Sequence, residues 1–238
     1  MQRMAGSGPY CPGDEIISVS AEQRFSQNLL KGKKVVQQVF FVRHGETDWN
    51  AFRRIQGQSD IPLNQTGRIQ AGKAAEAFRD LPLEICFSSP FSRAYETAEL
   101  ILQGRKVPIV MDDMLKEISY GSDEGQDLGR IHEDSGLPLH AFFHAPESYI
   151  PPDGGETIPR LQYRCGRFLE MLKEMDSRIQ GNVLVTTHGA WIQAMILLVD
   201  NRPVSEFWHG KRQGNCSVTV IRPEHSGWKL VAEAVSYI

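Results

Sequence analysis

The sequence predicts an α/β domain, because short apolar runs typical of buried strands are interleaved with segments of helical pattern. The clearest runs are Val39–Val42, Leu83–Ser88 and Asn182–Thr187, and each stops at a short polar motif. The 238 residues of the chain fit one large α/β domain or at most two small ones. A domain of this size buries roughly 70–75% of its unfolded surface and needs no cross-links.

The composition argues against several classes of protein. The formal net charge is −3, with 26 basic and 29 acidic residues, so nothing indicates binding to nucleic acid or to an anionic membrane. No run reaches the length of a membrane span, and Met1–Gly13 lacks the apolar core of a secretory signal, so we expect a cytoplasmic protein. The cysteines contain no Cys-x-x-Cys pair and signal neither a zinc nor a redox site; they are Cys11, Cys86, Cys165 and Cys216.

Residues 1–36 are expected to form an N-terminal extension that is partly disordered or carries a short helix. Met1–Asp14 is rich in Gly, Pro and Ser, as loose termini often are. Ala21–Leu30 is a candidate short helix that Ser20 would begin. The main domain is predicted to span residues 37–238.

The first candidate site follows the strand Val39–Val42, where the chain reads Arg43-His44-Gly45. A charged pair and a glycine cannot continue a buried strand, so they are placed at its carboxyl end, where open α/β sheets bind ligands. An arginine offers a planar fork of donors for phosphate, and a histidine can act as a nucleophile or an acid–base group. A basic surface turn is the alternative that these few residues leave open.

A turn-rich loop is expected from Ala51 to Gly67. Within it Gln56 and Gly57 are of interest, because a glycine lets its N–H approach an anion closely. The segment Gly67–Ala74 almost matches a nucleotide-binding loop. We reject that interpretation, since the final Ser/Thr is an alanine and no strand precedes the segment. It is predicted instead to begin a helix that ends near Asp80.

A second motif, Ser88–Ala98, follows the strand Leu83–Ser88. Ser92 is predicted to cap the next helix, which places Arg93 at the helix N-terminus. An arginine is unfavourable there for the helix dipole, and a bound phosphate would compensate for it. In isolation, an exposed arginine on a solvated helix is the alternative.

The middle of the chain is less regular. Beyond a predicted strand at Val107–Met111, the segment Leu115–Gly125 contains Glu117 and Glu124, which by themselves are compatible with a solvated loop. The stretch Gln126–Pro152 is expected to form short helices. Its histidines are more often surface or packed residues than metal ligands; they are His132, His140 and His144. Its aromatic residues could line a pocket over the site or pack a cap; they are Phe142, Phe143 and Tyr149.

The third motif repeats the first. The strand Asn182–Thr187 ends in His188-Gly189, and an apolar helix follows. A satisfied core histidine is the alternative for His188. Upstream, Asp153–Thr157 is predicted to open a long helix. The end of the chain is predicted to form a hairpin of two strands, Asn215–Val220 and Lys229–Ala234.

Taken in order, five segments between about residues 38 and 234 resemble the histidine phosphatase superfamily, the phosphoglycerate mutase-like proteins. The segments are Arg43–Asn50, Arg54–Gly67, Ser88–Ala98, Leu115–Gly125 and Thr187–Gly189. Gly155-Glu156-Thr157 is also similar to a segment of this superfamily. The ordered set is far more specific than any single motif. The resemblance implies a three-layer α/β/α sandwich with a largely parallel sheet, and it assigns residues 37–238 to a histidine phosphatase domain.

The resemblance also implies a site for a phosphomonoester. His44 would attack phosphorus and become a phosphohistidine, while Glu117 would protonate the leaving oxygen and then act as base on water. The charge on the phosphoryl group would be stabilised by Arg43, Arg93 and His188. Further implied phosphate-binding residues are Asn50, Gln56, Gly57, Gly189 and Glu156. Neither a metal nor a cofactor is expected.

These residues suit hydrolysis and also phosphoryl transfer between phosphoglycerates. The mutases usually have Arg-His-Tyr-Gly after the general acid, whereas here Ile118–Gly121 follows Glu117. They also usually have a longer insertion between the general acid and Gly-Glu-Ser, whereas the link from Glu117 to Gly155 is short. We therefore predict a phosphatase of small phosphate esters, similar to the bacterial α-ribazole phosphate enzyme and broad-specificity relatives. A mutase and a catalytically inactive phosphate-binding module are the alternatives. A homodimer is compatible with this prediction.

Overall fold

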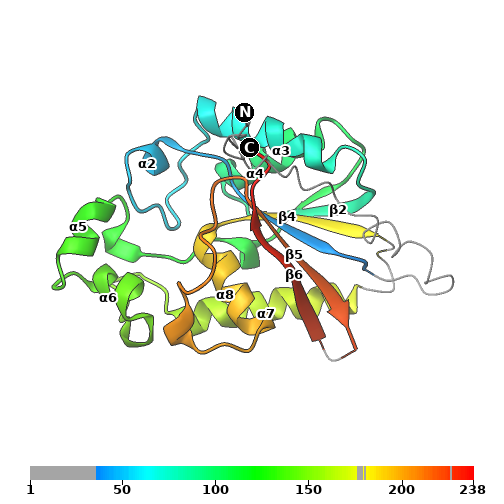
Figure 1. Cartoon of the computed structure of the whole chain (residues 1–238). Helices are drawn as coiled ribbons and strands as arrows, with labels where there is room; N and C mark the ends of the chain where they lie inside the picture. Colours follow the sequence, from blue (N-terminus) through cyan, green and yellow to red (C-terminus); the bar gives the residue numbers. More distant parts are fainter. Residues whose placement is uncertain (1–35, 176–178, 180, 226) are drawn as a thin grey trace, which may run out of the picture. The chain divides into compact units, whose positions relative to one another are not determined.

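A six-stranded sheet with the strand order β3-β2-β4-β1-β5-β6 forms the centre of the fold (Figure 1). The computed structural model describes residues 36–175, 179, 181–225 and 227–238. The candidate helix Ala21–Leu30 and nearly all of the predicted extension lie outside the described residues. The strands are β1 (Val39–Arg43), β2 (Leu83–Ser88), β3 (Ile109–Met111), β4 (Asn182–Thr187), β5 (Val218–Glu224) and β6 (Gly227–Val235).

The sheet is largely parallel, as predicted. Strand β4 runs parallel to β1 and β2, and β2 runs parallel to β3, whereas β5 and β6 pair antiparallel. In the pairing of β1 with β4, Arg43 lies opposite Thr187. The residues that follow these two strands, His44 and His188, therefore leave the sheet side by side at its carboxyl edge.

Helices cover both faces of the sheet, which gives the expected three layers (Figure 1). One face is covered by α3 (Gln65–Phe78) and α4 (Ser92–Leu102), and the other by α7 (Ile158–Glu174) and α8 (Gly189–Val199). Shorter helices are α2 (Asp48–Ala51), α5 (Leu128–Glu133) and α6 (Pro138–His144). Single 3-10 turns are η2 (Asp113–Leu115), η3 (Gly121–Asp123), η4 (Pro146–Ser148) and η5 (Val204–Glu206).

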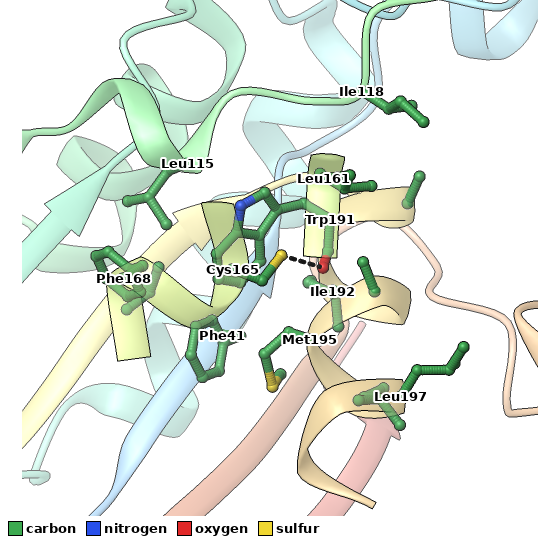
Figure 2. Close-up of a cluster of buried hydrophobic side chains, with 14 of the residues drawn as sticks. Phe41, Leu115, Ile118, Leu161, Cys165, Phe168, Trp191, Ile192, Met195 and Leu197 are labelled. Carbon is green, nitrogen blue, oxygen red and sulfur yellow. Dashed lines mark hydrogen bonds between the residues drawn. The ribbon is translucent and has the colours of Figure 1, made fainter. Parts of the chain in front are cut away.

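Two apolar cores hold the layers together. Successive residues of a strand point to opposite faces, so β1 supplies Phe41 to the core under α7 and α8 and Val42 to the core under α3 and α4. On the first side the Phe41 and Trp191 rings stack with centroids 5.5 Å apart, and Phe168 packs edge-on against Trp191 (Figure 2). All six residues of β4 are buried, as its continuous apolar pattern predicts.

Several predicted boundaries were correct and others differ. The closing hairpin forms, but its strands span Val218–Glu224 and Gly227–Val235 rather than Asn215–Val220 and Lys229–Ala234. Strands β2 and β4 have the predicted limits. The predicted strand Val107–Met111 begins only at Ile109, since Pro108 has no N–H to donate to a ladder. Ser92 does not cap α4, because the helix already begins at that residue. Its amide and hydroxyl groups both donate to the Asp60 carboxylate, each at 2.8 Å, so a carboxylate from a distant loop takes the capping role.

The stretch Gln126–Pro152 contains the short helices α5 and α6, as expected. Phe142 and Tyr149 are buried in the core under α7 and α8, while Phe143 stacks on Trp208 with ring centroids 5.3 Å apart. Of the two interpretations of these aromatic residues, packing of a cap is therefore the one that the structure supports. None of the helices in the described ranges is both long and apolar enough to cross a membrane.

Candidate active site

His44 lies buried directly beyond the end of β1. Its Nδ1 is 2.7 Å from the carbonyl oxygen of Gly45. Because a carbonyl only accepts, Nδ1 carries the proton and Nε2 keeps its lone pair. Gly45 is required here for close approach: a Cβ at this position would lie 2.6 Å from the carbonyl oxygen of Gly67.

His188 is the N-cap residue of α8 and is completely buried. Its ring centroid lies 5.2 Å from that of His44, so the two strand–histidine–glycine motifs meet in space. His188 Nε2 is 2.8 Å from the hydroxyl of Ser89, which also accepts from the amide of Phe91. If the hydroxyl donates to Nε2, the proton of the neutral ring is on Nδ1.

A turn before β5 holds Arg43 and His44 from the other side. Arg43 Nη1 donates to the carbonyl of Gln213 at 2.7 Å. The side-chain Nδ2 of Asn215 donates to the carbonyl of His44 at 3.0 Å and to Oδ1 of Asn50 at 3.2 Å. Sequence reasoning missed Gln213 and Asn215. Asn215 stood at the start of the predicted closing hairpin, and Gln213 two residues before it.

Arg93 is completely buried, so the alternative of an exposed arginine on a solvated helix is wrong. Nη1 donates to the carbonyl of Ser59 and Nη2 to that of Gly57, both at 2.7 Å. The guanidinium carbon also lies 4.8 Å from the centroid of the Phe91 ring. Burial lowers the pKa of Arg93 to about 10, which leaves the group charged at neutral pH.

The loop that receives Arg93 is held by Glu124. The Glu124 carboxylate accepts from the amides of Gln58 and Ser59 and from the Ser59 hydroxyl, at 2.6–2.8 Å. Gly57 has φ +54, and a Cβ there would lie within 2.2 Å of a Glu124 oxygen, so glycine is needed at this turn. Sequence reasoning placed Glu124 with Glu117 in the segment Leu115–Gly125 but missed its role in supporting this loop.

Glu117 reaches the site from a loop outside the regular elements, and its carboxylate lies at the N-terminus of α8. Oε1 accepts from the amides of Ile118 and Trp191, both at 3.0 Å, and Oε2 accepts from the amide of Ala190 at 3.1 Å. The side chain is 9% exposed, so Glu117 is not a residue of a solvated loop. The α8 N-terminus thus carries His188, Gly189 and the contacts of Glu117 in consecutive residues.

Burial sets the protonation states of the three acid–base groups. It lowers the pKa of His44 well below its usual range, and the guanidinium groups of Arg93 and Arg43 lower it further. The pKa of His188 is also lowered well below its usual range, by burial and then by Arg93. Burial raises the pKa of Glu117, although backbone N–H donors oppose this. The site therefore favours neutral imidazoles at both histidines and shifts Glu117 toward its protonated form.

The same region contains several buried polar atoms without a partner in the described part of the chain. Three can be donors, namely Arg43 Nε, Arg93 Nε and His188 Nδ1, and one is an acceptor, Gln56 Oε1. A buried donor left unpaired costs about 1–3 kcal/mol. An anion with several oxygen atoms would satisfy the donors, and a phosphoryl group is such an anion.

Two other predicted phosphate-binding residues adjoin this centre. A Cβ at Gly189 would lie 3.5 Å from Arg43 Nε, so the first residue of α8 borders that guanidinium. Asn50 uses Oδ1 to accept from the amide of Thr47 at 3.2 Å and from Asn215. Its Nδ2 group has no hydrogen-bond partner among the residues that the structure describes, so it is available as a donor.

Glu156 is placed differently from the rest. Both carboxylate oxygens bind Arg164, from Nε at 2.8 Å and from Nη2 at 2.7 Å. Arg164 in turn donates to the backbone of the segment that carries Glu117. These contacts do not support a direct contact of Glu156 with phosphate, which a carboxylate would repel. Sequence reasoning missed Arg164, which looks like an ordinary surface residue of a helix.

The three histidines of the cap lie close together on α5 and α6. His132 Nδ1 is 3.0 Å from His144 Nε2, and the rings of His140 and His144 stack with centroids 4.2 Å apart. Within the described ranges, no group of three or more His, Cys, Asp or Glu residues is arranged to hold a metal ion.

Comparison with known proteins was made for the family and for individual relatives. The sequence profile of the histidine phosphatase superfamily (branch 1) matches residues 39–235. A probable phosphoglycerate mutase, GpmB, of Salmonella choleraesuis is 34% identical over 195 residues, which are 80% of this chain and 87% of that protein.

Solved structures agree with the family match. YhfR of Bacillus stearothermophilus superposes with a TM-score of 0.77 at 30% identity, over 84% of this chain and 98% of that one. A mycobacterial glucosyl-3-phosphoglycerate phosphatase, solved with VO3, has a TM-score of 0.73 at 29% identity, over 84% of this chain and 100% of that one.

Proposed function

The chain belongs to the histidine phosphatase superfamily, and from that premise we propose that it hydrolyses a small phosphomonoester through a phosphohistidine on His44. The observation that carries this proposal is the placement of His44. It is a neutral imidazole whose Nδ1–H is held by a carbonyl at 2.7 Å, and it lies among buried cationic and hydrogen-bonding groups. The free Nε2 lone pair is the nucleophile.

The phosphoryl group would bind between the strand ends and the start of α4. In the transition state its charge is spread over the equatorial oxygens, and catalysis is mostly positioning and electrostatic stabilisation. Arg43 and Arg93 supply fixed positive charge, and their Nε donors have no partner among the described residues. His188 supplies a further donor. Smaller contributions are assigned to Asn50 and to the backbone of Gly189.

Glu117 is the proposed proton donor and acceptor. Its raised pKa keeps it protonated to higher pH than an ordinary glutamate. Oε1 accepts two backbone N–H groups and Oε2 only one, so Oε2 has the lone pair that can bind the proton. In the first step this proton passes to the leaving oxygen, and the bond between phosphorus and that oxygen breaks. In the second step the Glu117 carboxylate removes a proton from water as the water oxygen bonds to phosphorus. The bond between phosphorus and His44 Nε2 breaks, which releases phosphate and restores the neutral imidazole.

The mutase remains a second candidate, because a relative with 34% identity is a probable phosphoglycerate mutase. Hydrolysis is favoured by the short link between Glu117 and Gly155 and by relatives such as the glucosyl-3-phosphoglycerate phosphatase. We further propose that the substrate is a small cytoplasmic phosphate ester.

The deciding experiment measures phosphate release from p-nitrophenyl phosphate and from 3-phosphoglycerate, each with and without a chelator. Because the charge-stabilising groups belong to the protein, release is expected to survive the chelator. Activity lost with chelator and restored by a divalent ion would contradict the proposed mechanism. Transfer between phosphoglycerates without phosphate release would favour the mutase, and a folded protein that turns over no ester would favour the inactive module.

A further inference from the structure

The segment Met114–Ser119, which carries Glu117 and is called the acid segment below, has little secondary structure of its own. It includes Leu115, the last residue of the 3-10 turn η2, and both Leu115 and Ile118 are completely buried. Their side chains lie around the cluster formed by α7 and α8 (Figure 2). Apolar burial fixes the depth of the segment, but it does not fix the rotation of the backbone that aims a carboxylate, since apolar packing has no directional preference.

Single hydrogen bonds reach this backbone from Gln58, which donates to the Glu117 carbonyl at 3.0 Å, and from Thr187, which donates to the Leu115 carbonyl at 2.8 Å. The largest set of directional contacts comes from Arg164 on α7. Nη1 donates to the carbonyls of Met114 at 2.8 Å and Lys116 at 2.9 Å, and Nη2 donates to the carbonyl of Glu117 itself at 3.4 Å. One guanidinium therefore binds three carbonyls within four consecutive residues. The Met114 carbonyl also accepts from the Trp191 indole at 2.7 Å, which ties the same segment to α8.

Glu156 holds Arg164 in this orientation. It accepts from Nε and Nη2 in a two-pronged ion pair, and the two side chains are 18% and 7% exposed. With these bonds, all five N–H groups of the guanidinium have an acceptor. Burial alone would lower the pKa of Arg164, but its bonds to Glu156 outweigh burial and raise it. The Glu156 backbone amide also donates to the Ser119 carbonyl at 2.8 Å. Glu156 and Arg164 therefore both bind the backbone of the acid segment.

We propose that Arg164, clamped by Glu156, is a positioning residue that aims the Glu117 carboxyl group at the leaving oxygen. This inference rests on the proposed role of Glu117 as proton donor. Arg164 touches only backbone of the acid segment, so it would act through Glu117. A lysine cannot replace it, because a single ammonium group cannot serve two carboxylate oxygens and three carbonyls in one plane.

The test compares Arg164→Lys and Glu156→Gln with a matched control pair on α7, the helix that carries Arg164. Arg167 and Glu170 also form an ion pair, at 3.0 Å, but their side chains are 58% and 60% exposed. The measured quantity is the rate of phosphoenzyme formation in rapid quench, with glycerol phosphate and with p-nitrophenyl phosphate. An alkoxide leaving group needs the proton from Glu117, whereas nitrophenolate needs it much less.

The two site variants are expected to slow phosphoenzyme formation from glycerol phosphate on the order of 100-fold, which is the cost of misplacing a catalytic group by about 1 Å. With p-nitrophenyl phosphate the loss should stay below about threefold, and vanadate affinity should be unchanged, because no phosphate-binding residue is altered. Arg167→Lys and Glu170→Gln should behave as wild type on both substrates. In a Glu117→Gln background, Arg164→Lys should add no further loss, since both changes remove the same function.

Equal losses on both substrates would show a merely structural role and overturn the proposal. Failure of both site variants to fold, seen by circular dichroism, would assign the pair to fold stability and would also overturn it. A different result would contradict the premise that Glu117 is the proton donor. If Glu117→Gln itself shows no selective loss on glycerol phosphate, then Glu117 is not the proton donor, whatever the Arg164 variants do.

Discussion

The strand-end centre and the acid segment bring their functional groups to the same place by different means. His44 and His188 each follow a strand of a parallel pair directly, and the register of β1 and β4 sets their separation. Glu117 lies on a loop and is held by backbone amides of α8 and by a guanidinium from α7. In the first arrangement strand pairing sets the positions and polar contacts only orient the side chains, whereas in the second the position itself depends on several polar side chains. Mutations should therefore act in different ways in the two regions.

The two regions also share one electrostatic device. Burial lowers the pKa of His44 and raises that of Glu117, so it favours the neutral form of both groups. In the proposed mechanism the neutral form of the histidine is the nucleophile, and the neutral form of the glutamic acid is the proton donor. The four predictions below sharpen this comparison, beginning with the largest effect.

Removal of the nucleophile should have the largest effect. His44→Ala should lower kcat by more than about 10⁴-fold on every substrate, because no other group can form the phosphoenzyme. His140→Ala, which removes a histidine of the cap, is the control and should change kcat less than twofold. Steady-state kinetics and acid-quench labelling check both variants. Retention of more than a few per cent of activity by His44→Ala would show that the nucleophile is misassigned.

Removal of the acid should give a loss that depends on the substrate. Glu117→Gln should slow turnover of alkyl phosphates on the order of 10²–10⁴-fold. With p-nitrophenyl phosphate we expect a burst of nitrophenol followed by slow turnover, because phosphoenzyme breakdown still lacks its base. The label should then stay on His44.

Glu124→Gln is the matched control for that experiment, since it changes the second glutamate of the same motif. Its carboxylate binds the loop of Ser59 and not the leaving group, so it should show neither the burst nor the dependence on leaving group. Rapid mixing with both substrate types measures this. Similar behaviour of the two glutamine variants would remove Glu117 from the acid–base role.

Loss of a buried charge should affect binding and rate together. Arg93→Ala removes a fixed cation and should lower kcat/KM on the order of 100–1,000-fold, with weaker binding of vanadate. Arg105→Ala is a close control, because Arg105 also donates to two backbone carbonyls, those of Phe78 and Leu81. It should lower the melting temperature without changing vanadate affinity. If both variants lowered vanadate affinity equally, Arg93 would not be a phosphate ligand.

The smallest effect concerns pH. Because the pKa of Glu117 is raised, the phosphorylation rate with an alkyl phosphate should fall as pH rises through that pKa, at a pH above the ordinary range of a glutamate. Glu117→Gln should remove this alkaline limb. The pKa of His44 is lowered, so its protonation should not limit the rate near pH 6.5, the usual pKa of histidine.

The pH profile needs a control for the substrate, because phosphate esters themselves titrate near pH 6. Wild type and Glu117→Gln share that substrate ionisation, so the difference between their rapid-quench profiles isolates the protein group. A wild-type alkaline limb that persists unchanged in Glu117→Gln would assign it to another residue.

The sequence by itself determined the sheet and the strand-end motifs. The β-prone run with Val183, Leu184 and Val185 is enough to predict β4, and the polar residues that stop each run predict where the chain leaves the sheet. The prediction that Arg43, His44, Arg93 and His188 share one edge follows from these local patterns. The structure brings His44 and His188 to 5.2 Å between ring centroids and buries Arg93.

Only the tertiary structure decided how these groups are supported. Asp60 rather than a local serine binds the first turn of α4, and Glu124 fixes the loop that binds Arg93. The carboxylate of Glu156, which the sequence comparison placed near phosphate, forms an ion pair with Arg164. Each of these carboxylates pairs with a group that the fold brings close. Apolar periodicity is a local property that a short segment displays in full, whereas the partner of a polar side chain depends on which strands and helices become neighbours.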